Sequence, residues 1–265
     1  MKFLRKLLEF RENQDQPKPF LDHLEDLRRM LIKMAVVLVL MVLLCFAFRT
    51  GLANLLQRPL MALDSASIAH LQSLGVADSM TVSFQMSFYA GLVLAFPLLI
   101  LFLGEFIVPA LTPREKRLLF PAGAFCTLLF LTGAAFAYFV VLPDALAFFF
   151  RDARSMNWQP TWTVREYYTF VTQFIIAFGL AFELPLAVLL IVKLGWVSVA
   201  FLRKTRAFAL IVILVLAAII APTPDLFTFF LMAGPMYALY EICIWIAAFV
   251  ERKSTKDVSR HGPPP

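Results

Sequence analysis

Long, uninterrupted runs of apolar residues dominate the chain. Six runs stand out, and they cover residues 31–48, 84–108, 118–142, 168–192, 207–221 and 226–248. A helix needs about 20 apolar residues to cross the ~30 Å hydrocarbon core of a bilayer. The apolar residues do not alternate with polar ones, as they would in the strands of a membrane barrel. The pattern therefore predicts an all-α integral membrane protein with six transmembrane helices, the fifth and sixth of them short.

The connections between the runs carry proline and charged residues, which mark turns. Two of them contain amphipathic stretches, 53–63 and 145–154, that we expect to form helices lying over the outer face. The fifth run has fifteen residues between Arg206 and Pro222, and this makes about 22 Å of helix at ~1.5 Å per residue. Two interpretations stay open: the short fifth and sixth helices thin the bilayer, or Arg206 and Glu241 extend their charged groups to the interface.

Composition and charge strengthen the membrane assignment. Of the 265 residues, 61% are hydrophobic and only 16% are charged, which excludes an ordinary soluble domain and a disordered chain. The net charge of +6 does not indicate nucleic acid, because 19 of the 24 Lys and Arg residues lie in the N-terminal arm, the second and fourth connections and the C-terminal tail. Cytoplasmic loops carry such an excess. We therefore expect both termini in the cytoplasm, with an arm at 1–30, a membrane domain at 31–249 and a tail at 250–265.

Enzyme and metal signatures are missing from the sequence. It has neither a phosphate-binding G-x-x-x-x-G-K-[ST] loop nor an H-E-x-x-H metal motif, and all three histidines lie outside the apolar runs. The three cysteines each lie inside an apolar run without a C-x-x-C spacing, which is typical of small buried side chains. The sequence thus predicts no enzyme, no cofactor and no metal site.

One carboxylate lies deep in an apolar run. Glu183, near the middle of the fourth run, is followed by Pro185, which frees a backbone carbonyl one turn earlier. A charge at the centre of a membrane helix costs roughly 2.5–3.5 kcal/mol, so such residues are usually functional. Two interpretations are open: Glu183 contacts a substrate or partner helix, or it is protonated and hydrogen-bonded inside the bundle. Glu105 and Glu241 lie nearer the inner ends, where either a functional role or an extension to the interface fits.

Two charged clusters lie on the inner side. Residues 23–31 have leucines at helical spacing that lead directly into the first run, with acidic residues three to four positions before basic ones. In residues 109–117, Thr112 is placed to cap the third helix, with Pro113 at its first position and Glu115 at the capping-box position. On these grounds alone, the first cluster is a solvated helix start and Glu115 a capping residue.

Seven short motifs, in this order, resemble those of the TatC family, the multi-spanning receptor subunit of the twin-arginine protein translocase. They run from about residue 20 to residue 249, which is nearly the whole chain. The motifs are His23-Leu24-x-Asp26-Leu27-Arg28, Arg58-Pro59-Leu60, Phe106-Ile107-x-Pro109-Ala110-Leu111 with Glu115-x-Arg117, Ala137-Tyr138-Phe139 with Pro143, Phe178-Gly179-x-x-Phe182-Glu183-x-Pro185, Pro222-x-Pro224-Asp225, and Pro235-Met236-x-x-x-Tyr240-Glu241. Each motif alone is weak, whereas seven in this order are specific.

The resemblance implies a fold and a function. It implies six tilted helices in a cupped bundle that binds twin-arginine signal peptides of folded proteins. It also implies single-span partners of the TatA and TatB type, a homo-oligomer within the complex, the proton motive force as energy source, and a location in the bacterial inner membrane. An alternative from another class is a proton-coupled small-solute transporter that uses Glu183, and a third is a membrane scaffold without transport.

The resemblance also assigns residues. Glu115 matches a glutamate that contacts the twin arginines, and Asp26, with Glu25 adjacent, takes the place of a second acidic residue. The peptide site further includes Phe106 and Arg28. Glu183 and Glu241 are assigned to intramembrane or partner contacts, and Pro59 and Asp225 to the outer side. The family usually has Glu where this chain has Asp26, so which of Glu25 and Asp26 faces the peptide stays open.

Overall fold

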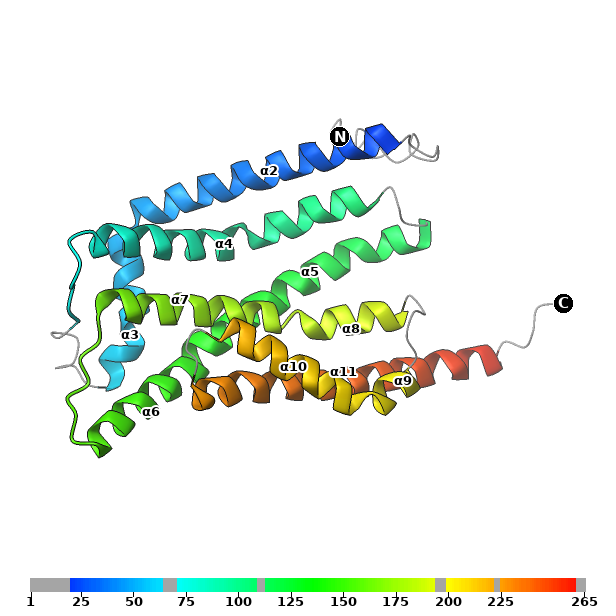
Figure 1. Ribbon diagram of the computed structural model, residues 1–265. Helices are drawn as coiled ribbons and strands as arrows, with labels where there is room; N and C mark the ends of the chain where they lie inside the picture. The colour runs from blue at the N-terminus through cyan, green and yellow to red at the C-terminus, as the bar shows by residue number, and fades with distance from the viewer. Residues whose placement is uncertain (1–19, 64–70, 109–112, 194–198, 222–224, 261–265) are drawn as a thin grey trace.

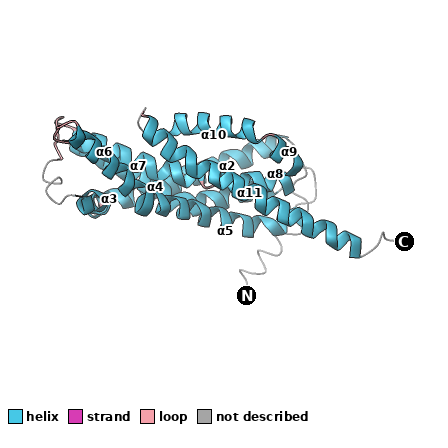
Figure 2. Cartoon of the chain, turned by 90° about the horizontal axis from the view of Figure 1, so that it is seen from below, coloured by secondary structure: helices cyan, strands magenta, loops and turns pink. Residues whose placement is uncertain are grey.

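Helices form almost all of the computed structural model, which describes residues 20–63, 71–108, 113–193, 199–221 and 225–260. The helices are α2 (Phe20–Ala47), α3 (Arg49–Leu63), α4 (Asp78–Ile107), α5 (Pro113–Phe136), the π-helical turn η3 (Ala137–Val141), α6 (Leu142–Ser155), α7 (Val164–Ala181), α8 (Leu184–Lys193), α9 (Val199–Lys204), α10 (Arg206–Ile220) and α11 (Leu226–Arg260). An isolated bridge between Gln72 and Thr163 is the one β contact within the described ranges. Figure 2 shows that helices make up most of the described residues.

The long helices run side by side along one direction, and α3 lies across one end of them (Figure 1). We call this end, with α3 and the connection between α6 and α7, the outer end. The opposite end holds the start of α2, the end of α4 and the start of α5, and we call it the inner end. The first residue of α2 and the last residue of α11 both lie toward the inner end (Figure 1). Both names follow the orientation expected from the distribution of Lys and Arg.

Within the described ranges, five helical segments are long and apolar enough to cross a membrane, which confirms the all-α membrane fold class. They are His23–Ala47, Asp78–Ile107, Pro121–Ser155, Val164–Leu190 and Leu226–Ile246. The remaining predicted span, the fifth, is α10, an apolar helix of 15 residues, about 22 Å long against ~30 Å of hydrocarbon. The end of α10 and the start of α11 both lie short of the outer end of the bundle (Figure 1). The count of six spans therefore stays a prediction. The predicted shortness of the fifth span agrees with the length of α10.

Both amphipathic stretches of the predicted outer loops are helical, but they differ in construction. Residues 53–63 lie in α3, a separate helix that buries Leu56 and Leu60 against the core. Residues 145–154 lie in α6, which continues α5 through the π-helical turn η3. A π turn inserts one extra residue into a helix and changes its direction locally. The third apolar run is consequently longer than 118–142 and reaches the outer end as α6.

Glycines bring two pairs of helices into close contact. A Cβ atom added at Gly91 of α4 would lie 2.8 Å from the backbone nitrogen of Val42 in α2. A Cβ atom added at Gly133 of α5 would lie 2.6 Å from the carbonyl oxygen of Phe178 in α7. Small residues permit such close approach of membrane helices, where dispersion and backbone contacts replace the hydrophobic effect. The core between these helices is rich in aromatic side chains, and Phe130 and Phe96 stack with centroids 3.7 Å apart.

The fourth apolar run is divided into α7 and α8 at Phe182 and Glu183. Pro185 has no N–H to donate to the carbonyl of Ala181, so the helical hydrogen-bond ladder ends there. The amide of Glu183 instead bonds to the carbonyl of Leu180 at 3.0 Å. The break places a carboxylate among backbone groups that are not part of a regular helix. The last helix shows no such interruption, because α11 runs continuously from Leu226 to Arg260, past residue 250, where the tail was predicted to begin. The prediction of a short sixth helix is therefore wrong, since Leu226–Ile246 alone is long enough to cross a membrane and the carboxylate of Glu241 does not end the helix.

Candidate functional site

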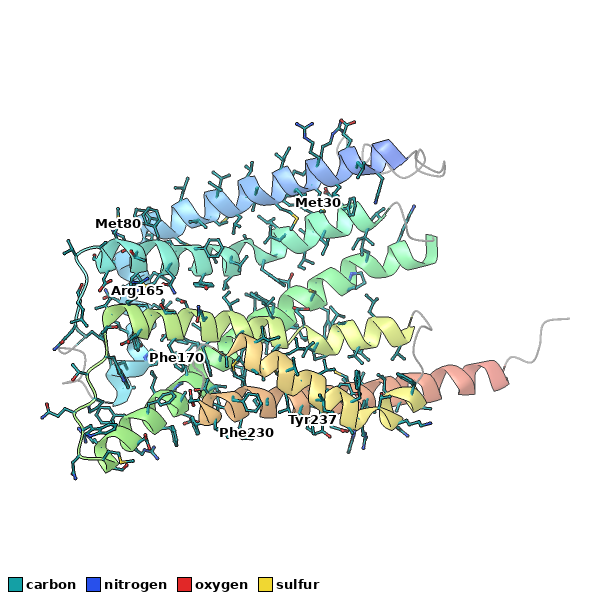
Figure 3. All side chains as sticks on the ribbon, in the orientation of Figure 1. Met30, Met80, Arg165, Phe170, Phe230 and Tyr237 are labelled. Atoms are coloured by element: carbon teal, nitrogen blue, oxygen red, sulfur yellow. The ribbon has the colours of Figure 1, made fainter. Side chains whose placement is uncertain are left out.

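The start of α2 faces the end of α4 through a helical stripe of side chains. His23 and Asp26 are half-buried, Met30 is buried, and all three lie at spacings of three to four residues, which places them on one face of the helix. Figure 3 shows Met30 between α2 and α4. Leu24, Glu25, Arg28 and Arg29 are exposed on the other faces. Asp26 and Glu25, which sequence alone could not separate, therefore have different surroundings.

An aromatic contact joins the two helices at this inner end. The imidazole of His23 stacks on the ring of Phe106, with centroids 4.6 Å apart and an interplanar angle of 24°. Phe106 lies in the last turn of α4, directly before the residues that lead to α5. The stack holds Phe106 near the face of α2 that carries Asp26. Two residues of the predicted peptide site, Phe106 and Asp26, are therefore brought to the same face of α2. His23, which makes the contact with Phe106, was not predicted as a site residue.

The remaining charges at the inner end form exposed ion pairs. Lys33 of α2 contacts Glu105 of α4 at 3.1 Å, and Arg29 contacts Glu25 at 2.6 Å within α2. More than half of each of these side chains is exposed. Exposed ion pairs contribute only about 0–1 kcal/mol. A stronger ligand can therefore displace Arg29 from Glu25 at little energetic cost.

Glu115 lies in the first turn of α5, which begins at Pro113 as the capping pattern predicts. Its side chain, and residues 109–112 before it, fall outside the described part of the structure. Its predicted contact with the twin arginines stays a prediction, as does the capping interpretation. Because α5 begins at the inner end beside the end of α4, the backbone of Glu115 lies at the same end of the bundle as Asp26 and Phe106 (Figure 1).

A second carboxylate lies inside the bundle. The thiol of Cys126 in α5 donates a hydrogen bond to Oε2 of Glu183, with the two atoms 2.9 Å apart. Oε1 of Glu183 is buried, and among the described residues it accepts no hydrogen bond. A buried polar atom without a partner costs about 1–3 kcal/mol, and this makes it a candidate contact for a donor from outside the chain. The hydrogen bond from Cys126 goes beyond the purely apolar role predicted for this cysteine.

Glu241 takes part in an ion pair between α10 and α11. Its Oε2 lies 3.0 Å from Nη2 of Arg206 at the start of α10, and its Oε1 accepts a hydrogen bond from the hydroxyl of Tyr237 at 3.1 Å. Figure 3 shows Tyr237 on α11. The charged groups of Arg206 and Glu241 therefore pair with each other. The simplest interpretation from the sequence had each of them extend separately to the membrane interface. The pair joins α10 to α11 across the predicted fifth and sixth spans.

Pro59 and Asp225 have clear structural contacts. Pro59 lies inside α3 and has no N–H to donate to the carbonyl of Leu55, one turn earlier. The hydroxyl of Tyr138 donates to that carbonyl at 2.7 Å. Asp225 precedes α11, and its Oδ1 accepts a hydrogen bond from the amide of Thr228 at 2.7 Å, which is helix capping.

Comparison with known proteins gives a consistent result. A family model described as Sec-independent protein translocase protein (TatC) matches residues 22–235. The chain belongs to the TatC family. A TatC protein from Campylobacter jejuni is 34% identical over 224 residues, which is 84% of this chain and 91% of that protein. A TatC protein from Akkermansia muciniphila is 47% identical over 176 residues, 66% of this chain but only 51% of that longer protein. The match to the latter thus spans about half of that relative's length.

Solved structures agree with the sequence comparison. A crystal structure of the twin-arginine translocase receptor TatC superposes with a TM-score of 0.76 at 32% identity, covering 86% of this chain and 98% of that one. TatC is a component of the Sec-independent protein translocase and a multi-pass membrane protein without enzymatic activity. The predictions of the family, the fold class and a non-enzymatic transport function are therefore confirmed.

Proposed function

We propose that the chain is the receptor subunit that binds twin-arginine signal peptides of folded proteins at its inner end. It does so in the bacterial cytoplasmic membrane, with six spans and both termini in the cytoplasm. Partner subunits of the TatA and TatB type then complete transport, which uses the proton motive force. The observation that carries this proposal is the stack of His23 on Phe106, which joins α2 to α4 at the inner end on the face of α2 that carries Asp26.

The chemistry of the ligand explains why acidic residues are needed in pairs. Two neighbouring guanidinium groups each present a planar set of donors that matches a carboxylate in a bidentate geometry. Asp26 shares its helix face with His23, whose ring stacks on Phe106. Glu25 points away from this face, where Arg29 contacts it. These positions favour Asp26 and Glu115 as the two carboxylates, with Glu25 and Arg28 at the edge of the site.

The assignment is tested by photo-crosslinking on the purified full chain in lipid nanodiscs. A photoreactive residue replaces Asp26, Glu115 or Glu25 in turn, and a twin-arginine peptide or its twin-lysine counterpart is added. We expect crosslinks to the twin-arginine peptide from Asp26 and Glu115, with weaker ones from Glu25. Equal crosslinking of both peptides would contradict the site. Strong crosslinks from Glu25 alone would reverse the choice between the two acidic residues of α2.

The membrane orientation has its own test. Single cysteines in a cysteine-free chain, placed in the N-terminal arm, in α3 and in the C-terminal tail, are labelled in intact cells with a reagent that does not cross the inner membrane. We expect labelling in α3 and none at either end of the chain. Labelling of one terminus but not the other would exclude an even number of spans.

We propose that the partner subunits contact the intramembrane carboxylates. Oε1 of Glu183, which accepts no hydrogen bond from the described residues, can accept one from a polar side chain of a single-span partner. Glu241 lies on α11, where it pairs with Arg206 of α10. We expect Glu183→Ala to weaken co-purification of a TatA- or TatB-type subunit while signal-peptide binding persists. Unchanged co-purification would remove Glu183 from the partner contact. The family assignment disfavours the alternative of a small-solute transporter based on Glu183.

A further inference from the structure

A cavity of about 510 Å³ lies toward the outer end of the bundle, away from the proposed peptide site. Its walls come from the end of α2, from α3, from the middle of α4 and from α7. Phe48, Leu55, Val93 and Ile176 represent these four walls. The volume lies within the range of about 300–1,000 Å³ that is typical of small-molecule sites.

The lining of the cavity is aliphatic and aromatic almost throughout. The hydroxyl of Thr172 is one of its few polar groups, and it already donates to the carbonyl of Tyr168 at 2.7 Å. Apolar cavities of this kind do not hold ordered water, because a bound water needs two to four polar partners. The cavity is therefore suited to a hydrocarbon occupant.

The residues at its rim face the surroundings of the bundle. Phe48 is 68% exposed and Leu94 is 54% exposed, and Leu44 and Leu55 are also exposed. In a chain that spans a bilayer, such apolar side chains contact lipid. An acyl chain can therefore enter the cavity from the bilayer without passing through water.

A positively charged side chain lies beside the same rim of the cavity. Arg49 directly follows Phe48, and its guanidinium lies 5.0 Å from the centroid of the Phe46 ring. Arg49 is exposed, and no carboxylate of the described residues forms an ion pair with it. At the predicted outer boundary of the hydrocarbon, the anions at hand are lipid phosphates. Arginine binds phosphate in a bidentate manner.

We propose that this cavity binds one acyl chain of a phospholipid, with the phosphate of the same lipid on Arg49. An acyl chain enters directly from the bilayer along the exposed apolar rim, and the guanidinium of Arg49 lies where the phosphate of the same lipid would be. An apolar partner helix would leave this guanidinium without an anionic contact. The bound lipid fills the space between α3 and α7, so it becomes part of the packing beneath α3.

Gly51 provides a sharp test, because it lines the cavity and a Cβ atom added there meets no atom within 4 Å. We therefore expect a leucine side chain to extend from this position into the cavity, and leucine also favours helix more than glycine does. The full chain is extracted from nanodiscs made of equal parts phosphatidylcholine and phosphatidylglycerol and examined by native mass spectrometry. We expect one phospholipid to be retained by the parent chain and by Gly51→Ala, and to be lost from Gly51→Leu.

The headgroup contact is tested with a charge-matched pair of variants. Arg49→Gln should reduce the preference for phosphatidylglycerol about threefold, as expected for a single exposed charge pair. Arg165→Gln removes an exposed charge from the same outer end but lies outside the cavity lining, so it should leave this preference unchanged. Figure 3 shows Arg165 at the start of α7.

Three results would overturn the proposal. The first is equal lipid retention by Gly51→Leu and the parent chain. The second is an equal effect of the two arginine variants on headgroup preference. The third comes from a photoreactive residue at Leu55, on the rim: crosslinks to a polypeptide in place of lipid, in the presence of signal peptide and partner subunits, would show that a helix occupies the cavity.

Discussion

The contact between Tyr138 and the carbonyl of Leu55 should stabilise the outer end because Pro59 makes it necessary. Pro59 has no N–H, so the Leu55 carbonyl lacks its usual helical donor, and the Tyr138 hydroxyl takes that place at 2.7 Å. A typical hydrogen bond contributes about 0.5–1.5 kcal/mol net. Because this one is exposed, we expect Tyr138→Phe to lower the free energy of unfolding by about 1 kcal/mol, which is about 2–4 °C in Tm for a chain of this size.

A double-mutant cycle on the detergent-purified chain, followed by thermal unfolding, isolates this effect. Pro59→Ala restores a backbone N–H that can reach the Leu55 carbonyl, so Tyr138→Phe should then have almost no effect. The matched control is Tyr167, whose hydroxyl donates at 2.7 Å to the carbonyl of Leu56, which is not opposite a proline. Tyr167→Phe should destabilise equally in both backgrounds. Additive effects of Tyr138→Phe and Pro59→Ala would refute the reasoning.

Two further predictions concern helix packing and the ion pair between α10 and α11. Gly91→Leu should lower the free energy of unfolding by about 1–3 kcal/mol or more, since its Cβ meets the α2 backbone, whereas Gly234→Leu, with open space around it, should have little effect in the same thermal assay. Arg206→Glu should destabilise α10 against α11 by placing two carboxylates together, and the added Glu241→Arg should restore thermal stability; failure of the exchanged pair to recover would show that the ion pair is not what joins these helices.

Much of the fold could be predicted because continuous apolar runs are a strong sequence signal of membrane helices. The runs located the long helices, and the amphipathic stretches located α3 and part of α6. The positions at which a helix ends or changes direction were harder to predict from the sequence. Pro185 marked a freed carbonyl, but whether a helix kinks or breaks at a proline depends on its neighbours, and here it separates α7 from α8. No sequence pattern indicated the π-helical turn before α6.

The candidate site, too, could be predicted only in part from the sequence. Acidic residues and Phe106 were identified from motifs, whereas their contacts depend on which helices pack together. The stack of His23 on Phe106 and the hydrogen bond from Cys126 to Glu183 join residues far apart in the chain. His23 did carry a signal, since it lies three residues before Asp26 at helical spacing. Cys126 carried none, because a thiol in an apolar run is ordinarily a packing residue.

The most direct test of the account is the affinity of the purified full chain for a twin-arginine signal peptide relative to its twin-lysine counterpart. Two bidentate carboxylate contacts should favour the arginine peptide at least about tenfold, since hydrogen bonds to charged groups contribute about 1.5–3 kcal/mol each. The double variant Asp26→Asn, Glu115→Gln should remove most of that preference. Equal affinities for the two peptides in the parent chain would contradict the claim that acidic residues at the inner end select paired guanidinium groups.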